Sequence, residues 1–167
     1  MSKREADILV ALQSMAYNPA VVKTARSLSH FGEHDLGWLA VAGVGMIVDK
    51  PRRRQWAALG AGTFTAHAAS VVIKRFVRRP RPHDERVNIG VKTPSKLSFP
   101  SSHATNTGAA AVHLAQITGS KVPYVGVPIM MLSRMVLGVH YPTDTLAGAL
   151  LGAGVATATI KVEKETR

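Results

Sequence analysis

The chain has 167 residues, the length of one domain, and its 21 Lys and Arg against 10 Asp and Glu give a formal net charge of +11. This charge points to an anionic partner: a membrane surface, a phosphorylated substrate or a nucleic acid. The sequence has no cysteine, which excludes disulfides and thiol chemistry. Acidic residues interrupt the first apolar run, so we expect no signal peptide.

The first predicted elements are one or two amphipathic helices within residues 1–31, covering about Arg4–His30. Apolar residues recur there at helical spacing beside polar ones, and Asn18-Pro19 interrupts the run. We expect these helices to lie at the membrane interface. The alternatives are a helix packed on the rest of the protein, or a further span, which the short and polar run disfavours.

Five segments without Asp, Glu, Lys or Arg follow: Leu36–Val48, Gln55–Ile73, Leu97–Ser120, Val122–Ser133 and Thr145–Ile160. A spanning helix needs about 17–25 apolar residues, which Gln55–Ile73 provides and Leu36–Val48 does not. The fold class we predict is all-α: one domain over residues 1–167, with a multi-pass cell-membrane bundle of about five short spans over residues 36–160. Gly148 and Gly152 form a small-residue helix face that suits close packing, within the bundle or with a second copy.

Three short polar signatures lie at the ends of these segments: Lys74 with Arg81-Pro82, then Pro100-Ser101-Ser102-His103, then Ser133-Arg134 with His140 and Asp144. Because successive spans alternate in direction, all three fall on one face of the membrane. The opposite face carries the basic run Lys50–Arg54, Lys121 and the tail after Ile160. Basic residues are shared between the two faces, so the positive-inside rule leaves the orientation open.

The residue types in the signatures fit phosphoryl transfer, which needs positive charge around the phosphate oxygens, a nucleophile and a proton for the leaving oxygen. Lys74, Arg81 and Arg134 supply the charge, and an arginine fork can pair with two phosphate oxygens. Ser101 is a favoured N-cap, and a helix N-terminus there can bind an anion through free N–H groups.

The third signature predicts the start of the last helix. Pro142 suits the first helical position, which puts His140 just before the helix and Asp144 in its first turn. We expect Asp144 to accept a hydrogen bond from the His140 ring, fixing the tautomer and raising the basicity of the other nitrogen.

These residues resemble the three motifs of the type-2 phosphatidic acid phosphatase superfamily, KxxxxxxRP, PSGH and SRxxxxxHxxxD, with Ser102 where the motif often has Gly. The resemblance implies metal-independent hydrolysis without a cofactor. The resemblance also implies that His140 attacks phosphorus, that Asp144 orients His140, and that His103 protonates the leaving oxygen. The remaining motif residues hold the phosphate: Lys74, Arg81, Ser101, Ser102 and Arg134.

The short chain and Ser27–Ala40 are similar to small membrane phosphatases that act on polyprenyl-linked substrates. The implied reaction converts a decaprenyl-linked phosphoribose to decaprenylphosphoryl-ribose, a precursor of cell-wall arabinan. Undecaprenyl diphosphate, phosphatidic acid and phosphatidylglycerophosphate are the alternative substrates. The expected surroundings are a bilayer with anionic lipids.

Three other classes of protein compete with this interpretation. A basic membrane protein that binds lipid without catalysis would not need His140 or Asp144, and aromatic residues are too few (5%) to favour nucleic-acid binding. A transporter would want charged or broken helices at mid-membrane. Vanadate-dependent haloperoxidases share the motifs, but the long uncharged segments disfavour a soluble enzyme.

Overall fold

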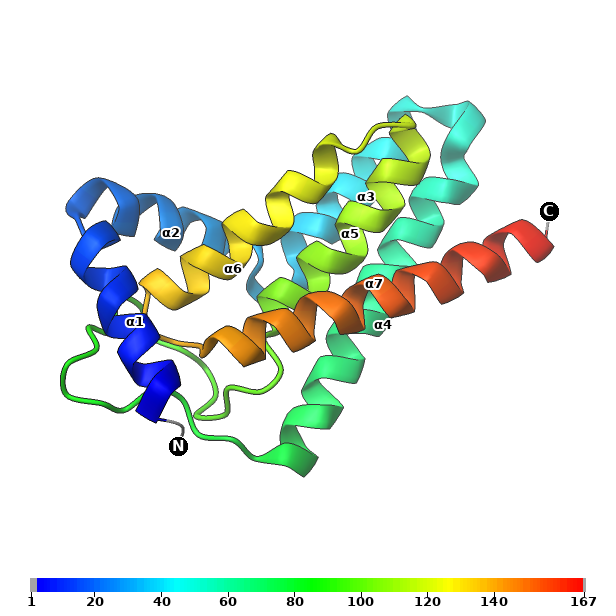
Figure 1. The fold of residues 1–167 in the computed structure, drawn as a ribbon. Helices are drawn as coiled ribbons and strands as arrows, with labels where there is room; N and C mark the ends of the chain where they lie inside the picture. Colours follow the sequence, from blue (N-terminus) through cyan, green and yellow to red (C-terminus); the bar gives the residue numbers. More distant parts are fainter. Residues whose placement is uncertain (1–2, 167) are drawn as a thin grey trace.

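The computed structural model describes residues 3–166, and within that range the chain is helical, with one isolated β-bridge between Pro80 and Leu97. Seven α-helices and three short 3-10 helices follow one another (Figure 1): α1 Lys3–Ala16, α2 Pro19–Phe31, η1 Glu33–Asp35, α3 Leu36–Val48, η2 Lys50–Arg52, α4 Arg53–Val77, α5 Ser102–Thr118, η3 Val122–Val125, α6 Gly126–Val136 and α7 Pro142–Glu165. The all-α prediction is confirmed.

Helix α5 lies at the centre of the bundle, between α4 and α7 (Figure 1). Its buried face is built from small residues, which let the neighbouring backbones approach closely. A Cβ on Gly108 would come within 2.5 Å of the Ala149 carbonyl oxygen, and one on Gly152 within 1.9 Å of the Thr105 carbonyl oxygen. The small-residue face of α7 therefore packs against α5 within the chain and is not free to contact a second copy.

The two N-terminal helices form where the amphipathic pattern predicts them, and they pack on the rest of the protein. Leu9 of α1 is fully buried in a cluster with Val87 and Tyr141. The Gln13 amide donates to the carbonyl oxygens of Asn88 (2.8 Å) and Val136 (2.9 Å). Helix α2 packs against α6. These contacts join the N-terminal segment to the end of the bundle that carries the signatures.

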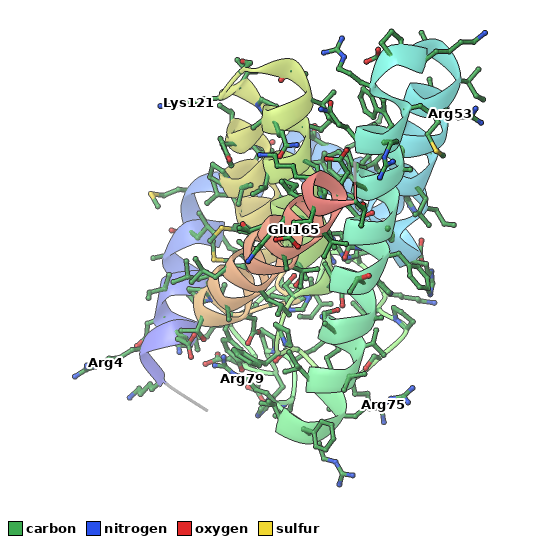
Figure 2. All side chains as sticks on the ribbon, turned by 90° about the vertical axis from the view of Figure 1, so that its right-hand side faces the viewer. Arg4, Arg53, Arg75, Arg79, Lys121 and Glu165 are labelled. Carbon is green, nitrogen blue, oxygen red and sulfur yellow. The ribbon has the colours of Figure 1, made fainter. Side chains whose placement is uncertain are left out.

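Charged side chains gather at the two ends of the molecule (Figure 2). Arg4, Arg75 and Arg79 lie at one end, and Arg53 and Lys121 lie at the other. The long connection between α4 and α5 closes the first end, held by hydrogen bonds such as Arg81 N–H to the Lys96 carbonyl (3.2 Å). This division agrees with the prediction that the signatures share one face.

Two helical stretches of the described chain are long and apolar enough to cross a membrane: Lys50–Val77 and Pro142–Glu165. They contain two of the five predicted spans. The other predicted spans fall in α3, α5 and α6, which are shorter. Five spans therefore remain a prediction.

Candidate active site

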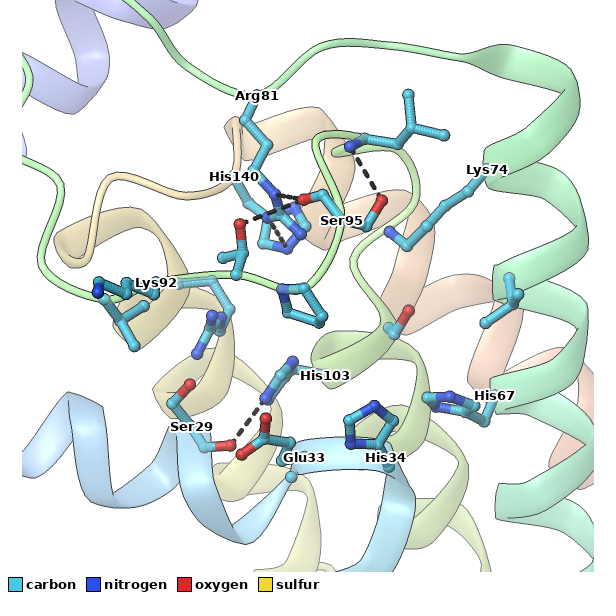
Figure 3. Close-up of a pocket in the computed structure, with 18 of the residues that line it drawn as sticks. Ser29, Glu33, His34, His67, Lys74, Arg81, Lys92, Ser95, His103 and His140 are labelled. Carbon is cyan, nitrogen blue, oxygen red and sulfur yellow. Dashed lines mark hydrogen bonds between the residues drawn. The ribbon is translucent and has the colours of Figure 1, made fainter.

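A cavity of about 480 Å³ opens at the end of the bundle where the three signatures meet (Figure 3). Six of the eight predicted site residues line it: Lys74, Arg81, Ser102, His103, Arg134 and His140. The other two do not line it: Asp144 lies next to the His140 ring, and Ser101 is the N-cap residue of α5. Residues 66 positions apart in the chain thus come together at one site.

The ring of His140 is almost fully buried between α6 and α7, with 2% of the residue exposed. Its Nε2 lies 3.1 Å from Nη1 of Arg81. A guanidinium only donates, so Nε2 carries a lone pair and the ring proton sits on Nδ1. Burial, reinforced by Arg81, Arg134 and Lys74, holds the pKa of His140 well below its usual value. The lone pair of this neutral imidazole accepts the Arg81 N–H at the wall of the cavity, and a substrate phosphate has to displace that contact.

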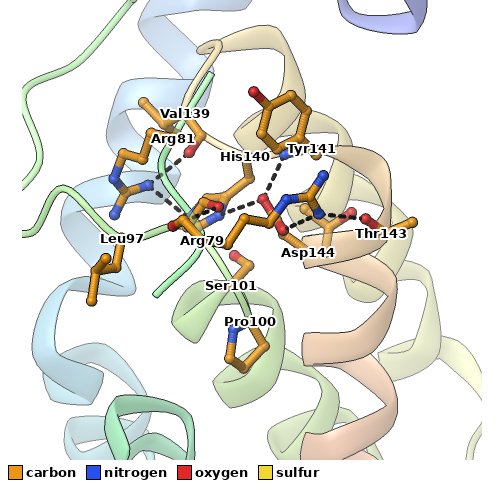
Figure 4. Close-up of polar contacts among 12 residues, drawn as sticks. Arg79, Arg81, Leu97, Pro100, Ser101, Val139, His140, Tyr141, Thr143 and Asp144 are labelled. Carbon is orange, nitrogen blue, oxygen red and sulfur yellow. Dashed lines mark hydrogen bonds and ion pairs between the residues drawn. The ribbon is translucent and has the colours of Figure 1, made fainter. Parts of the chain in front are cut away.

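Asp144 lies in the first turn of α7 as predicted, but it does not accept a hydrogen bond from His140. Its Oδ2 is 3.6 Å from Nδ1 of His140, beyond hydrogen-bond range, and this nitrogen has no partner among the described residues. The same oxygen accepts the backbone N–H of Tyr141 at 2.8 Å, forming a capping box at the helix start (Figure 4). Capping the helix thus competes with contacting the ring.

Three cations surround the His140 lone pair, each fixed differently. Arg81 donates from Nε to the Ser95 carbonyl (2.8 Å) and from Nη1 to the Val139 carbonyl (2.7 Å), and burial lowers its pKa to about 10. Lys74 donates to the carbonyl oxygens of Ser98 and Pro100. These carbonyls hold both side chains at the cavity wall.

Arg134 differs from the other two cations because its buried side chain keeps unused donors. Only 2% of the residue is exposed, and Nε and Nη1 have no acceptor among the described residues. Buried donors without partners are costly. A bound oxyanion in the cavity would supply the missing acceptors.

The serines of the second signature have separate places. Ser101 is fully buried and caps α5, its Oγ accepting the Ala104 N–H at 3.5 Å, so its side chain does not line the cavity. Ser102 is the first residue of α5 and lines the cavity, and its Oγ accepts a hydrogen bond from Ser70 (2.8 Å). Ser102 has no positive φ, so serine fits where the motif often has glycine.

His103 faces His140 across the cavity (Figure 3). Its Nε2 lies 2.9 Å from the carbonyl oxygen of Ser29 in α2, so Nε2 carries a proton and donates it. Its other ring nitrogen points toward His140. A proton on that nitrogen is placed to reach an oxygen bound between the two histidines.

Arg79 is a site residue that the sequence did not reveal. Its guanidinium donates to Oδ1 of Asp144 (2.7 Å) and to Oγ1 of Thr143 (2.7 Å) (Figure 4). It also pairs with Glu5 of α1. It lies 4.2 Å above the ring of Tyr141. Nothing in the sequence distinguishes Arg79 from the neighbouring arginines, because its partner Glu5 is distant in the chain.

The comparisons with known proteins show the family of the chain. The model of the PAP2 superfamily matches residues 55–167, and the chain belongs to that superfamily. This confirms the resemblance indicated by the three signatures.

Two curated relatives match most of the chain. A decaprenylphosphoryl-5-phosphoribose phosphatase of Mycolicibacterium smegmatis is 58% identical over 142 residues, covering 84% of this chain and 79% of the relative. A decaprenylphosphoryl-5-phosphoribose phosphatase of Mycobacterium tuberculosis is 53% identical over 152 residues, which cover 90% of this chain and 86% of the relative. These relatives are named as phosphatases, the enzyme class that the signatures predict.

The fold is also similar to that of a transmembrane PAP2-type phosphatidylglycerolphosphate phosphatase from Bacillus subtilis. The TM-score is 0.75 at 21% identity, and the match covers 99% of this chain and 89% of that one.

Proposed function

We propose that this protein is a membrane phosphatase that removes the 5-phosphate from decaprenylphosphoryl-5-phosphoribose. The observation that carries the proposal is the neutral, buried His140, whose Nε2 accepts the Arg81 N–H at the wall of a cavity that Lys74, Arg81 and Arg134 also line. The identities of 58% and 53% to relatives named for this substrate support the lipid assignment.

The proposed reaction has two steps. Nε2 of His140 attacks phosphorus and forms a phosphohistidine, while the P–O bond to the ribose breaks. His103 enters this step as an imidazolium: it keeps the Nε2 proton on the Ser29 carbonyl and gives the proton on its other ring nitrogen to the leaving ribose oxygen. Water, activated by His103, then attacks the phosphohistidine and frees inorganic phosphate. The three cations offset the charge on the phosphoryl oxygens, Ser102 contributes at the start of α5, and Asp144 stabilises the charge that develops on His140.

The proposed setting is the cell membrane, with about five spans and the N-terminal helices at the interface. Support comes from the apolar side chains that the bundle leaves exposed on its flanks, among them Ile47, Phe64, Val72, Leu146 and Leu150. Exposed arginines at the cavity end would contact anionic headgroups, each worth about 1 kcal/mol.

A substrate panel with purified protein in detergent tests the proposal. We expect kcat/KM for decaprenylphosphoryl-5-phosphoribose to exceed that for undecaprenyl diphosphate, phosphatidic acid and phosphatidylglycerophosphate by at least about tenfold, corresponding to about 1.4 kcal/mol. EDTA should leave the rate unchanged. A higher kcat/KM for any other lipid contradicts the substrate assignment, and loss of activity in EDTA contradicts the mechanism.

A further inference from the structure

The cavity has two chemically different halves. The half around His140 is lined by Lys74, Arg81 and Arg134. The other half is lined by Glu33 and His34 of η1 and by His67 of α4. Among the described residues that line the cavity, Glu33 is the only carboxylate.

The geometry of attack decides which half receives the leaving group. In an in-line displacement the leaving oxygen lies opposite the attacking nitrogen, so it lies on the His103 side of the phosphorus. Figure 3 shows Glu33 and His34 beyond His103, away from His140. The group attached to the leaving oxygen therefore enters the half that contains Glu33.

The segment that carries Glu33 is fixed against the His103 ring. Ser29 accepts the hydrogen bond from Nε2 of His103, and a Cβ on Gly32 would come within 2.6 Å of the ring. His34 and Asp35 hold left-handed conformations, with φ of 51° and 66°, and Asp35 is fully buried. Glu33 thus sits on a closely packed turn beside the general acid.

The Glu33 side chain is half exposed, and its Oε2 lies 3.7 Å from Nδ1 of His30, outside hydrogen-bond range. Its two oxygens can accept hydrogen bonds from two adjacent hydroxyls of a bound molecule. The same charge repels a leaving group whose negative charge lies directly at the scissile bond, such as the second phosphate of a diphosphate.

We propose that Glu33 is a specificity-determining residue that binds the hydroxyls of a sugar next to the scissile phosphate and disfavours diphosphates. The proposal rests on the proposed function, because ribose 5-phosphate places the 2- and 3-hydroxyls in this half of the cavity. Glu33 takes no part in the chemical step.

Glu33→Gln tests this role, because it removes the charge and keeps the size of the side chain. We expect kcat/KM for decaprenylphosphoryl-5-phosphoribose to fall about tenfold, since a charge-assisted hydrogen bond becomes a neutral one. The rate on the 2-deoxyribose analogue should fall less, and kcat/KM for undecaprenyl diphosphate should rise. Glu85→Gln is the matched control, because Glu85 is exposed and lies outside the cavity lining. Its kcat/KM values for the three substrates should equal those of the wild type.

The outcomes separate this inference from the proposed function. If Glu33→Gln changes all three substrates by the same factor, or changes none, Glu33 does not determine specificity. If the wild type fails on the phosphoribose lipid but cleaves another phosphomonoester, the proposed function is wrong. In that case the measurement with undecaprenyl diphosphate decides the role of Glu33. If Glu33→Gln leaves kcat/KM for the diphosphate unchanged, the role of Glu33 is overturned as well.

Discussion

At the scale of single residues, Arg79 links the N-terminal helix to the carboxylate behind His140. It pairs with both Glu5 and Asp144, and Thr143 donates to Oε1 of Glu5 at 2.6 Å. Asp144 is fully buried, so removing Arg79 takes away the cation that contacts its carboxylate directly. Arg79 is therefore a positioning residue for Asp144.

We expect Arg79→Met to lower kcat about 10- to 100-fold with little change in KM, because Asp144 loses the partner that holds it near His140. Arg79→Lys keeps the charge and should restore part of kcat. Steady-state kinetics on the phosphoribose lipid measure both. Arg78→Met is the control, since the exposed Arg78 side chain bonds only the Arg75 carbonyl within residues 3–166. A rise in KM alone, or equal losses in the Met and Lys variants, would contradict this role.

Asp35 should make stability depend on pH. Burial raises its pKa to about 6 from 3.8, and the opposing effect of the Thr63 hydroxyl is smaller. The folded state therefore holds this proton more tightly than the unfolded state, and stability falls as pH rises from about 4 through 6.

We expect Asp35→Asn to melt at higher temperature than the wild type at pH 7.5, by a margin worth roughly 2 kcal/mol, and to show a much smaller margin at pH 4.5. Thermal unfolding in detergent at the two pH values measures the difference. An equal margin at both would show that the Asp35 carboxyl does not titrate in this window.

At the scale of elements, the contact between α5 and α7 brings two parts of the site together. The backbone N–H of Ser101 donates to the Asp144 carbonyl at 3.0 Å, and Gly148 and Gly152 lie against the first turns of α5. A shift of α7 would thus move Asp144 relative to His103.

We expect Gly152→Ala to destabilise the protein by about 1–3 kcal/mol, because the added Cβ would lie 1.9 Å from the Thr105 carbonyl oxygen. Gly154→Ala on the same helix is the matched control. It meets nothing within 4 Å and should gain up to about 1 kcal/mol from helix propensity. The melting temperatures of the two variants are compared with that of the wild type. An equal shift in both variants would show that α7 does not pack closely on α5.

Helix starts were predictable from sequence because they depend on neighbouring residues. Ser101 caps α5, and Pro142 opens α7, as their local patterns indicate. The 3.6 Å separation of Asp144 from His140 was not predictable, because it reflects competition from the Tyr141 N–H. The Glu5–Arg79 pair was not predictable either, since it depends on how α1 packs on the bundle.

At the scale of the whole molecule, apolar flanks separate two charged ends, and the cavity opens at one of them. Long uncharged segments predicted this arrangement. They could not fix the number of spans, because α3 and α6 are short and α5 is rich in small polar residues. The uncharged segments also could not predict that Glu33 lines the cavity, because that depends on how the helices pack.

Single cysteines in this cysteine-free chain test the arrangement of the two ends. Lys92→Cys lies at the cavity, and Lys121→Cys precedes η3 at the opposite end. In sealed vesicles, a membrane-impermeant maleimide should label the two positions from opposite sides. The side that labels position 92 gives the orientation of the site, and labelling of both positions from one side would contradict a spanning bundle.

Trapping the phosphoenzyme tests the central claim that His140 is the nucleophile. Rapid acid-free quenching of the wild type with 5-³²P-labelled decaprenylphosphoryl-5-phosphoribose should give labelled protein whose phosphate is stable in base and lost in acid, as expected of a phosphohistidine. Peptide mapping should place the label on His140, and His140→Asn should give no labelled protein and no phosphate release. Label on another residue, or phosphate release by His140→Asn at the wild-type rate, would contradict the account.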